Sequence, residues 1–235
     1  MESTSSLKDI LINRQEELKH HICLESKIDI HNLEKIAGVD LAYWIQNDKE
    51  YACCCIVVID YTKENHLIIE KKYCIGEITV PYIPGCLAFR EYDLVEKAVG
   101  ELVSDVDLFI FDGNGYLHPR HMGLATYAGI MLGKPSIGVA KSFYKFVEFD
   151  YSKLLDEEFA YKDIVIDDEI YGRVLRTHKG VKPIFLSIGN MITIDEATEI
   201  IKNLISEESR IPIPTRYADI MTHEIRKSAR LCVKG

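Results

Sequence analysis

Residues 36–44 read Ile-Ala-Gly-Val-Asp-Leu-Ala-Tyr-Trp, an apolar, strand-like run interrupted by a single acidic residue, Asp40. The run lacks the glycine-rich turn into a helix that a dinucleotide site requires, which disfavours a doubly wound nucleotide-binding fold. An unpaired carboxylate at a buried position costs more free energy than folding can spare unless something neutralises it. The stretch therefore predicts a central strand, and on it a place where a cation is needed.

Further strands follow this run. Two are predicted over residues 51–61 and 66–79, and the polar turn between them indicates an antiparallel meander. After a break at residues 81–85, strands and helices alternate: a helix to about residue 103, a strand over 107–112, a helix over 122–132, strands over 136–140, 171–177 and 184–187, and helices after 195 and 215. This order predicts an α/β fold with a ribonuclease H-like mixed central sheet, three antiparallel strands first, flanked by helices.

The length of 235 residues, of which 47% are hydrophobic, predicts one domain over residues 1–235. An amphipathic helix is expected over residues 7–24, and the acidic segment 151–168 is expected to be an exposed insertion. No apolar run approaches membrane-spanning length, and the first residues lack the order of a signal peptide. We therefore expect a cytoplasmic monomer with no membrane partner.

The composition also limits the ligands. Seven cysteines without zinc-site spacing, three of them consecutive at residues 53–55, are expected to be reduced core residues. A formal net charge of −9 argues against a nonspecific binder of polyanions, because phosphate contacts need local positive charge. Any nucleic-acid site must then be a local patch, assisted by metal.

Two further acidic residues share the features of Asp40. Asp112 ends the predicted strand over residues 107–112, and Glu91 lies on the inward face of a predicted helix. Any one of these acids alone is better explained as a paired buried carboxylate or a helix cap. Three together favour a pair of divalent ions, which can activate water and stabilise both oxygens of an in-line displacement at phosphorus.

Other polar residues have two interpretations each. Lys141, at the end of a strand, is either a phosphate contact or a snorkelling surface lysine. Asp219 and His223 share a helix face, as an outer metal ligand and its partner or as a surface ion pair. The basic segment 173–182, which contains Lys179, is either a patch for a nucleic-acid backbone or a solvated strand edge.

Several separated motifs, in matching order over about residues 35–225, resemble those of the endonuclease V family. They are Ile36-Ala37-Gly38-Val39-Asp40, Pro81-Tyr82-Ile83-Pro84-Gly85, Phe89-Arg90-Glu91, Asp112-Gly113 with His118-Pro119-Arg120, Gly138-Val139-Ala140-Lys141-Ser142, Lys179-Gly180-Val181-Lys182-Pro183, and Pro214-Thr215-Arg216 with Ala218-Asp219 and His223-Glu224. A set of this size is far more specific than any single motif.

The resemblance implies a catalytic core over about residues 35–225 and an enzyme that uses Mg²⁺, with Mn²⁺ as a substitute. Its expected reaction is hydrolysis of the second phosphodiester bond 3′ to inosine or deoxyinosine, in repair of deaminated adenine or in cleavage of inosine-containing RNA. Asp40, Glu91 and Asp112 carry over as metal ligands, with Asp40 shared by two ions. Lys141 and His223 carry over as further catalytic residues.

The resemblance also implies residues that contact the nucleic acid. Tyr82 matches the wedge that fills the gap when the altered base leaves the stack. Gly85 and Gly113 match the base pocket, where absent side chains let the main chain approach closely. The other expected contacts to the strand are Ile83, Pro84, His118, Arg120 and Lys179.

Two alternatives stay open at this point. One is a ribonuclease H-like nuclease with another target, which would keep the three acids without needing Tyr82 or the glycine pocket. The other is an interaction module for nucleic acid or protein, in which the acids are structural and no divalent ion gives activity.

Overall fold

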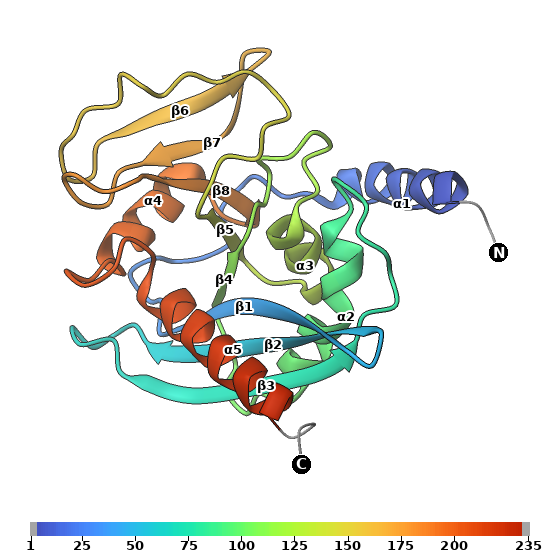
Figure 1. The fold of residues 1–235 in the computed structure, drawn as a ribbon. Coiled ribbons are helices and arrows are strands. Elements are labelled where there is room, and N and C mark those ends of the chain that lie inside the picture. The colour runs from blue at the N-terminus through green and yellow to red at the C-terminus, as the bar shows by residue number, and fades with distance from the viewer. Residues whose placement is uncertain (1–3, 232–235) are drawn as a thin grey trace.

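An eight-stranded mixed sheet lies at the centre of the computed structural model, which describes residues 4–231 (Figure 1). In spatial order its strands are β3 Ile68–Glu77, β2 Lys49–Asp60, β1 Lys35–Gln46, β4 Leu108–Asp112, β5 Ser136–Ala140, β8 Ile184–Asn190, β7 Glu169–Leu175 and β6 Tyr161–Ile166. Strands β1, β4 and β5 run parallel, and every other neighbouring pair is antiparallel. The antiparallel start and the later alternation confirm the predicted ribonuclease H-like sheet.

Helices cover both faces of this sheet (Figure 1). They are α1 Thr4–Leu18, the 3-10 helix η1 Lys19–His21, α2 Leu87–Gly100, α3 Leu124–Leu132, α4 Ile194–Asn203 and α5 Ile213–Leu231. Helices α2 and α3 pack on one face, whereas α4 and α5 pack on the other. None of these helices has the length and apolar content needed to cross a bilayer within residues 4–231.

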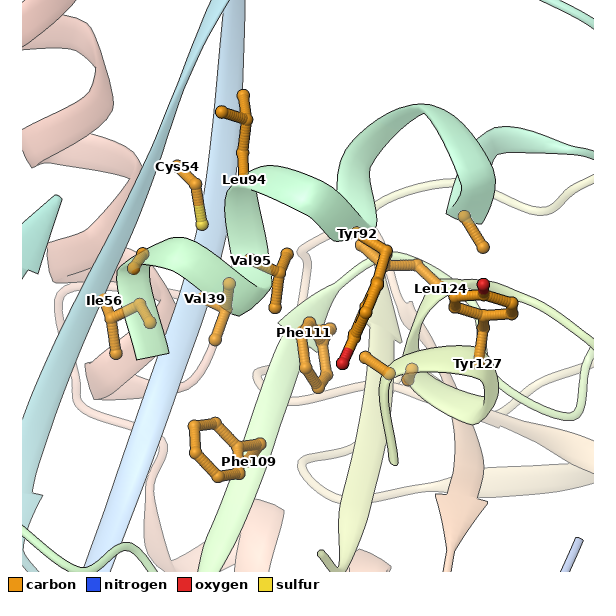
Figure 2. Close-up of a cluster of buried hydrophobic side chains, with 14 of the residues drawn as sticks. Val39, Cys54, Ile56, Tyr92, Leu94, Val95, Phe109, Phe111, Leu124 and Tyr127 are labelled. Carbon is orange, nitrogen blue, oxygen red and sulfur yellow. The ribbon is translucent and has the colours of Figure 1, made fainter. Parts of the chain in front are cut away.

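The core on the α2–α3 face is made of alternate strand residues. Val39 of β1 and Phe109 and Phe111 of β4 point into it, where they meet Val95 of α2 and Tyr127 of α3 (Figure 2). Successive side chains of a strand point to opposite faces. The even-numbered residues of β1 and β4 therefore face α4 and α5, and this parity decides which acids can meet.

Two predicted elements differ from the observed ones. The first helix was expected over residues 7–24, but α1 ends at Leu18 and η1 ends at His21. The segment 151–168, expected to be an exposed insertion, contains the edge strand β6, in which only Ile164 is buried. An edge strand with one buried residue leaves almost no apolar alternation in the sequence. The six cysteines within the described residues are free, as predicted, but Cys23 and Cys74 are only partly buried and so are not core residues; Cys232 lies outside the described residues.

Candidate active site

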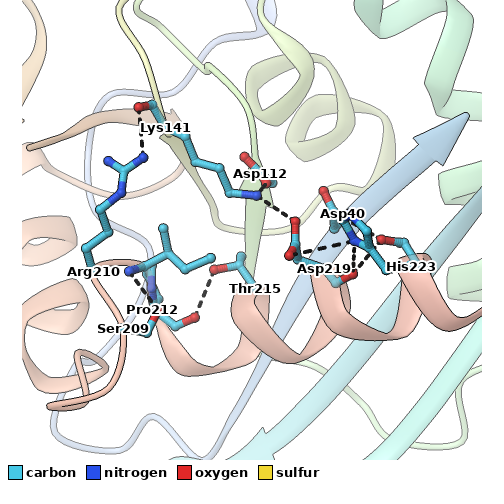
Figure 3. Close-up of polar contacts among 11 residues, drawn as sticks. Asp40, Asp112, Lys141, Ser209, Arg210, Pro212, Thr215, Asp219 and His223 are labelled. Carbon is cyan, nitrogen blue, oxygen red and sulfur yellow. Dashed lines mark hydrogen bonds and ion pairs between the residues drawn. The ribbon is translucent and has the colours of Figure 1, made fainter. Parts of the chain in front are cut away.

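Three carboxylates meet on the α5 side of the sheet (Figure 3). Asp40 lies within β1, Asp112 is the last residue of β4, and Asp219 lies in the second turn of α5. Each offers one oxygen, and these three oxygens all lie within 4.8 Å of one another. Asp40 and Asp112 meet because β1 and β4 are parallel neighbours and both residues have the parity that faces α5.

The third acid reaches this point because α5 contacts β1 at Gly38. A Cβ atom on Gly38 would lie 2.1 Å from the carbonyl carbon of Pro214 and 2.3 Å from the nitrogen of Thr215. No other amino acid leaves room for the first turn of α5 at that distance. Gly38 thereby lets α5 run close above β1 and carry Asp219 to Asp40.

The negative charge of Asp40 is unfavourable in its buried position. Its side chain is buried, with a relative exposure of 7%, and Thr222 donates a hydrogen bond of 2.9 Å to its Oδ2 atom. Burial, followed by the negative charge of Asp112, raises the pKa of Asp40 to about 8. A carboxylate in this position is stabilised as the anion by a nearby cation.

Lys141, the residue that follows β5, supplies one positive charge. Its Nζ atom lies 2.5 Å from Oδ2 of Asp112 and 2.7 Å from Oδ1 of Asp219 (Figure 3). Burial disfavours the charged form of Lys141, but hydrogen bonds to both carboxylates outweigh it, so its pKa is above the ordinary value. Lys141, expected to be a phosphate contact or a snorkelling surface lysine, therefore lies against two of the three acids.

The donor set suits a hard divalent cation. Asp40, Asp112 and Asp219 offer only carboxylate oxygens, which are the ligands that Mg²⁺ and Mn²⁺ prefer. His223 lies beside them, with its Nδ1 atom 2.8 Å from the main-chain oxygen of Asp219. Because a carbonyl only accepts hydrogen bonds, Nδ1 carries the proton and Nε2 is left with a free lone pair.

Glu91 approaches from the other side of the sheet. It is buried in α2 and accepts a hydrogen bond from the hydroxyl of Tyr43, an odd-numbered residue of β1. Burial, and to a smaller extent the charge of Asp112, raises the pKa of Glu91 to about 7. Its oxygens are not within the set of three, so the fold unites two of the three predicted acids and adds Asp219.

A pocket of about 380 Å³ opens next to the carboxylates. Asp112 and Lys141 form part of its wall, and Tyr82, Gly85 and His118 line the opposite part. Tyr82 is 67% exposed at the rim, whereas Ile83 is buried. The pocket therefore joins the predicted base-binding loop to the acids without a break.

The loop over this pocket is held by the carbonyl oxygen of Gly85. This oxygen accepts hydrogen bonds from Gln15 Nε2 at 2.9 Å, His118 Nε2 at 3.1 Å and Arg120 Nη2 at 2.8 Å. Gly85 has a φ of +78°, a backbone conformation that residues other than glycine rarely adopt. His118 and Arg120, expected to contact the strand, instead have these polar atoms directed at the protein's own loop.

His118 can donate to Gly85 because of its tautomer. Its Nδ1 atom accepts hydrogen bonds from the main-chain nitrogens of Arg120 and Met122, at 3.2 and 3.3 Å, so the proton resides on Nε2. Burial lowers the pKa of His118 to about 4. The imidazole is therefore neutral at physiological pH, which favours a positioning role over a phosphate contact.

Gln15 is the residue of this loop support that sequence analysis missed. It is fully buried in α1 and also donates to the carbonyl of Met122 at 3.2 Å, while its Oε1 accepts from Arg120 Nε at 2.6 Å. The one available signal was its spacing, because Gln15 lies four residues after Leu11 and three before Leu18, on the apolar face of the amphipathic helix.

We expect Gln15→Ala to destabilise the fold measurably. The change leaves Arg120 Nε and the Met122 carbonyl without their partner, at about 1–3 kcal/mol for each buried group left unpaired. Urea unfolding measures the loss, and Glu16→Ala, at the exposed neighbouring position of α1, is the matched control. Equal stability of the two variants would contradict the role of Gln15.

The other predicted contacts lie in different surroundings. Gly113 lies between two residues that line the pocket, and Pro84 and Lys179 are exposed. Within the predicted basic segment, Arg173 pairs with Asp163 at 2.6 Å, and Arg176 donates a hydrogen bond of 2.9 Å to the carbonyl of Leu155. These guanidinium groups serve the fold, which leaves Lys179 and Lys182 as the exposed cations of that stretch.

Comparisons with known proteins agree with this geometry. The family model described as endonuclease V matches residues 16–220. Endonuclease V of Bacillus thuringiensis subsp. konkukian is 54% identical over 214 residues, which cover 91% of this chain and 90% of that protein.

Solved structures are similar as well. The crystal structure of the Bacillus subtilis endonuclease V has a TM-score of 0.89 and 46% identity, covering 98% of this chain and 94% of that chain. The Ciona intestinalis endonuclease V, solved in complex with a 24mer DNA containing an inosine followed by a ribo-adenosine, has a TM-score of 0.82. At 23% identity over 95% of this chain and 99% of that one, the second similarity concerns the fold.

Proposed function

Because the chain belongs to the endonuclease V family, we propose that it hydrolyses the second phosphodiester bond 3′ to inosine or deoxyinosine, using Mg²⁺ or, as a substitute, Mn²⁺. The observation that carries the proposal is the gathering of three carboxylate oxygens within 4.8 Å beside a pocket large enough for a base. The Ciona relative was solved with inosine-containing DNA, which supports the same class of substrate for this chain.

In this proposal the acids hold the metal. Asp40 and Asp112 are fixed by β1 and β4 and Asp219 by α5, and Asp40, which lies deepest, would be shared by two ions. A bound divalent ion lowers the pKa of a water molecule and neutralises the charge that develops at phosphorus. Glu91 is proposed as a further ligand from the α2 side, and His223 as one through its free Nε2.

Lys141 is proposed to contact the scissile phosphate. Its ammonium group lies between Asp112 and Asp219, and these carboxylates keep it protonated. A lysine at the edge of the acid cluster can stay in contact with the phosphate while the geometry at phosphorus changes during hydrolysis. Its ammonium group is a compact charge on a flexible side chain.

Selectivity is proposed to come from hydrogen bonds in the pocket. Hypoxanthine has an acceptor at position 6 and a donor at position 1, the reverse of adenine. Fixed main-chain groups near Gly85 and Gly113 that match hypoxanthine would be left unpaired by adenine, at a cost of about 1–3 kcal/mol for each group. The Gly85 carbonyl already accepts three hydrogen bonds, so the reading groups would be its neighbours.

A cleavage assay tests this function. With Mg²⁺, the wild-type protein should cut an inosine strand and spare a matched adenosine strand, and Tyr82→Ala should lower that preference by roughly tenfold, since stacking on an aromatic ring contributes about 1–3 kcal/mol per base. Tyr82 is mostly exposed, so its loss should leave the fold intact. Tyr73→Ala, at an exposed tyrosine of β3, is the control.

The alternatives give different outcomes. Wild-type cleavage that is indifferent to inosine would favour a ribonuclease H-like nuclease with another target. Absence of cleavage with any divalent ion would favour an interaction module. A comparison of DNA and RNA strands with one inosine each, at fixed salt, would identify the natural substrate.

A further inference from the structure

A groove of about 1020 Å³ runs between the C-terminal half of α5 and the hairpin that joins β1 to β2. Its α5 wall is made of His223, Arg226, Lys227 and Arg230, and Ile45 of β1 is on the facing wall. It lies near the turn of the hairpin, next to the part of α5 that approaches the C-terminus (Figure 1). Of the residues of this α5 wall, the proposed hydrolysis uses only His223.

The groove is continuous with the acid cluster. His223 and Arg226 line both the groove and the cavity around the three acids. On its other side, that cavity shares Asp112 and Lys141 with the base pocket. Figure 3 shows Lys141, Asp112 and His223 following one another along α5. The acids therefore lie between the base pocket and the groove.

The charge of the groove is positive and uncompensated. Arg226, Lys227 and Arg230 are three or four residues apart from one another or from His223, so all lie on one face of α5. None of the three forms an ion pair with a carboxylate among residues 4–231. The one acidic residue in the wall, Glu50, is paired with Arg90. In a chain with a net charge of −9, such a concentrated patch favours an anionic ligand.

We propose that this groove binds the sugar-phosphate backbone of the substrate on the 3′ side of the cut. The polarity rests on the proposed function: the altered base enters the pocket, the second bond on its 3′ side reaches the acids, and the following nucleotides continue in the same direction. Arg226, which lines both spaces, would meet the first phosphate after the cut. Lys227 and Arg230 would meet later ones.

The groove assignment is tested by varying the length of the substrate strand on each side of the cut. We compare the wild-type protein with Lys227→Gln/Arg230→Gln, and use Lys63→Gln/Lys71→Gln as a control that removes the same charge from exposed positions around β3. Arg226 is left unchanged because it also borders the acids. The substrates are single strands with one inosine and either a long 3′ flank or one that ends at the second nucleotide after the cut.

The expected result is a difference confined to the long 3′ flank. On it, the double variant should lose roughly tenfold in kcat/KM, and the slope of log affinity against log salt, measured in EDTA, should fall by about 0.7 for each lost phosphate contact. On the short 3′ flank the variant and the wild-type protein should be equal, and shortening the 5′ flank should not change their ratio. The control should behave as wild type throughout.

Several results would overturn the groove assignment. They are an equal loss in the control, an equal loss on the short 3′ flank, or a loss that follows the 5′ flank instead. The affinity measurement needs no cleavage, so it separates this inference from the proposed function. A wild-type protein that fails to cut inosine strands would refute the function, whereas unchanged affinity and salt slope in the double variant would refute the groove.

Discussion

Asp40→Asn should abolish magnesium-dependent cleavage of an inosine strand, lowering the rate by several orders of magnitude, while the protein stays folded. The amide keeps the size of the side chain but removes the charge that holds a cation. Chelation of divalent ions in the wild-type protein should have the same effect. Asp105→Asn, at an exposed acid paired with Lys134, should cut at the wild-type rate.

Although Asp40→Asn should lose activity, it should not lose stability when metal is absent. Asp40 has a pKa of about 8 in the fold, against 3.8 when unperturbed, so without metal the folded state holds its proton more tightly than the unfolded state. Its ionisation therefore costs stability as pH rises from about 4 to about 8. Asparagine carries no such cost, and urea unfolding at pH 8 in EDTA should find Asp40→Asn at least as stable as wild type. Retained cleavage in this variant would remove the metal mechanism.

Gly38→Ala should damage both the fold and the activity. The new Cβ would lie 2.1 Å from main-chain carbon of Pro214, far inside contact distance, and main chain cannot rotate away as a flexible side chain can. Overpacking of this kind costs about 1–3 kcal/mol, occasionally more, and here the relief available is a displacement of α5 that carries Asp219 away from Asp40. We expect a lower midpoint of urea unfolding and a cleavage rate that is roughly a hundredfold lower.

Gly100→Ala is the matched control, because a Cβ at that last residue of α2 would meet nothing within 4 Å. It should be at least as stable as the wild-type protein and should cut at the wild-type rate. If Gly38→Ala unfolds entirely, Asp219→Asn tests the same dependence without the clash. Wild-type stability and cleavage in Gly38→Ala would show that α5 does not depend on this contact.

The sequence was sufficient for seven of the eight strands, all but the edge strand β6, and for two of the three clustered acids. Strong apolar runs made β1 and β4 recognisable. An acid within or at the end of such a run stands out, because burying its charge costs free energy unless it has a function or a partner. The face of the sheet that a helix covers is not visible in this way. Glu91 lies inward on α2, as predicted, but α2 packs on the face opposite to Asp40, whereas α5 brings Asp219 to the same face.

Motifs located other site residues without giving their orientation. His118 and Arg120 belong to a motif shared with the family, yet their polar atoms are directed at Gly85, which only the arrangement of three chain segments could show. The basic groove depends likewise on a hairpin lying beside α5. Arg226, Lys227 and Arg230 were not among the predicted site residues, because the opposite wall of the groove comes from a distant part of the chain.

The loop over the base pocket is anchored differently from the hydrolytic groups. Asp40, Asp112 and Asp219 are carried by the sheet and the last helix, whereas the Gly85 carbonyl is held by the first helix through Gln15 and by the segment after β4 through His118 and Arg120. Under the proposed function, a change at Gln15 would therefore act on the loop that admits the base and not directly on the carboxylates.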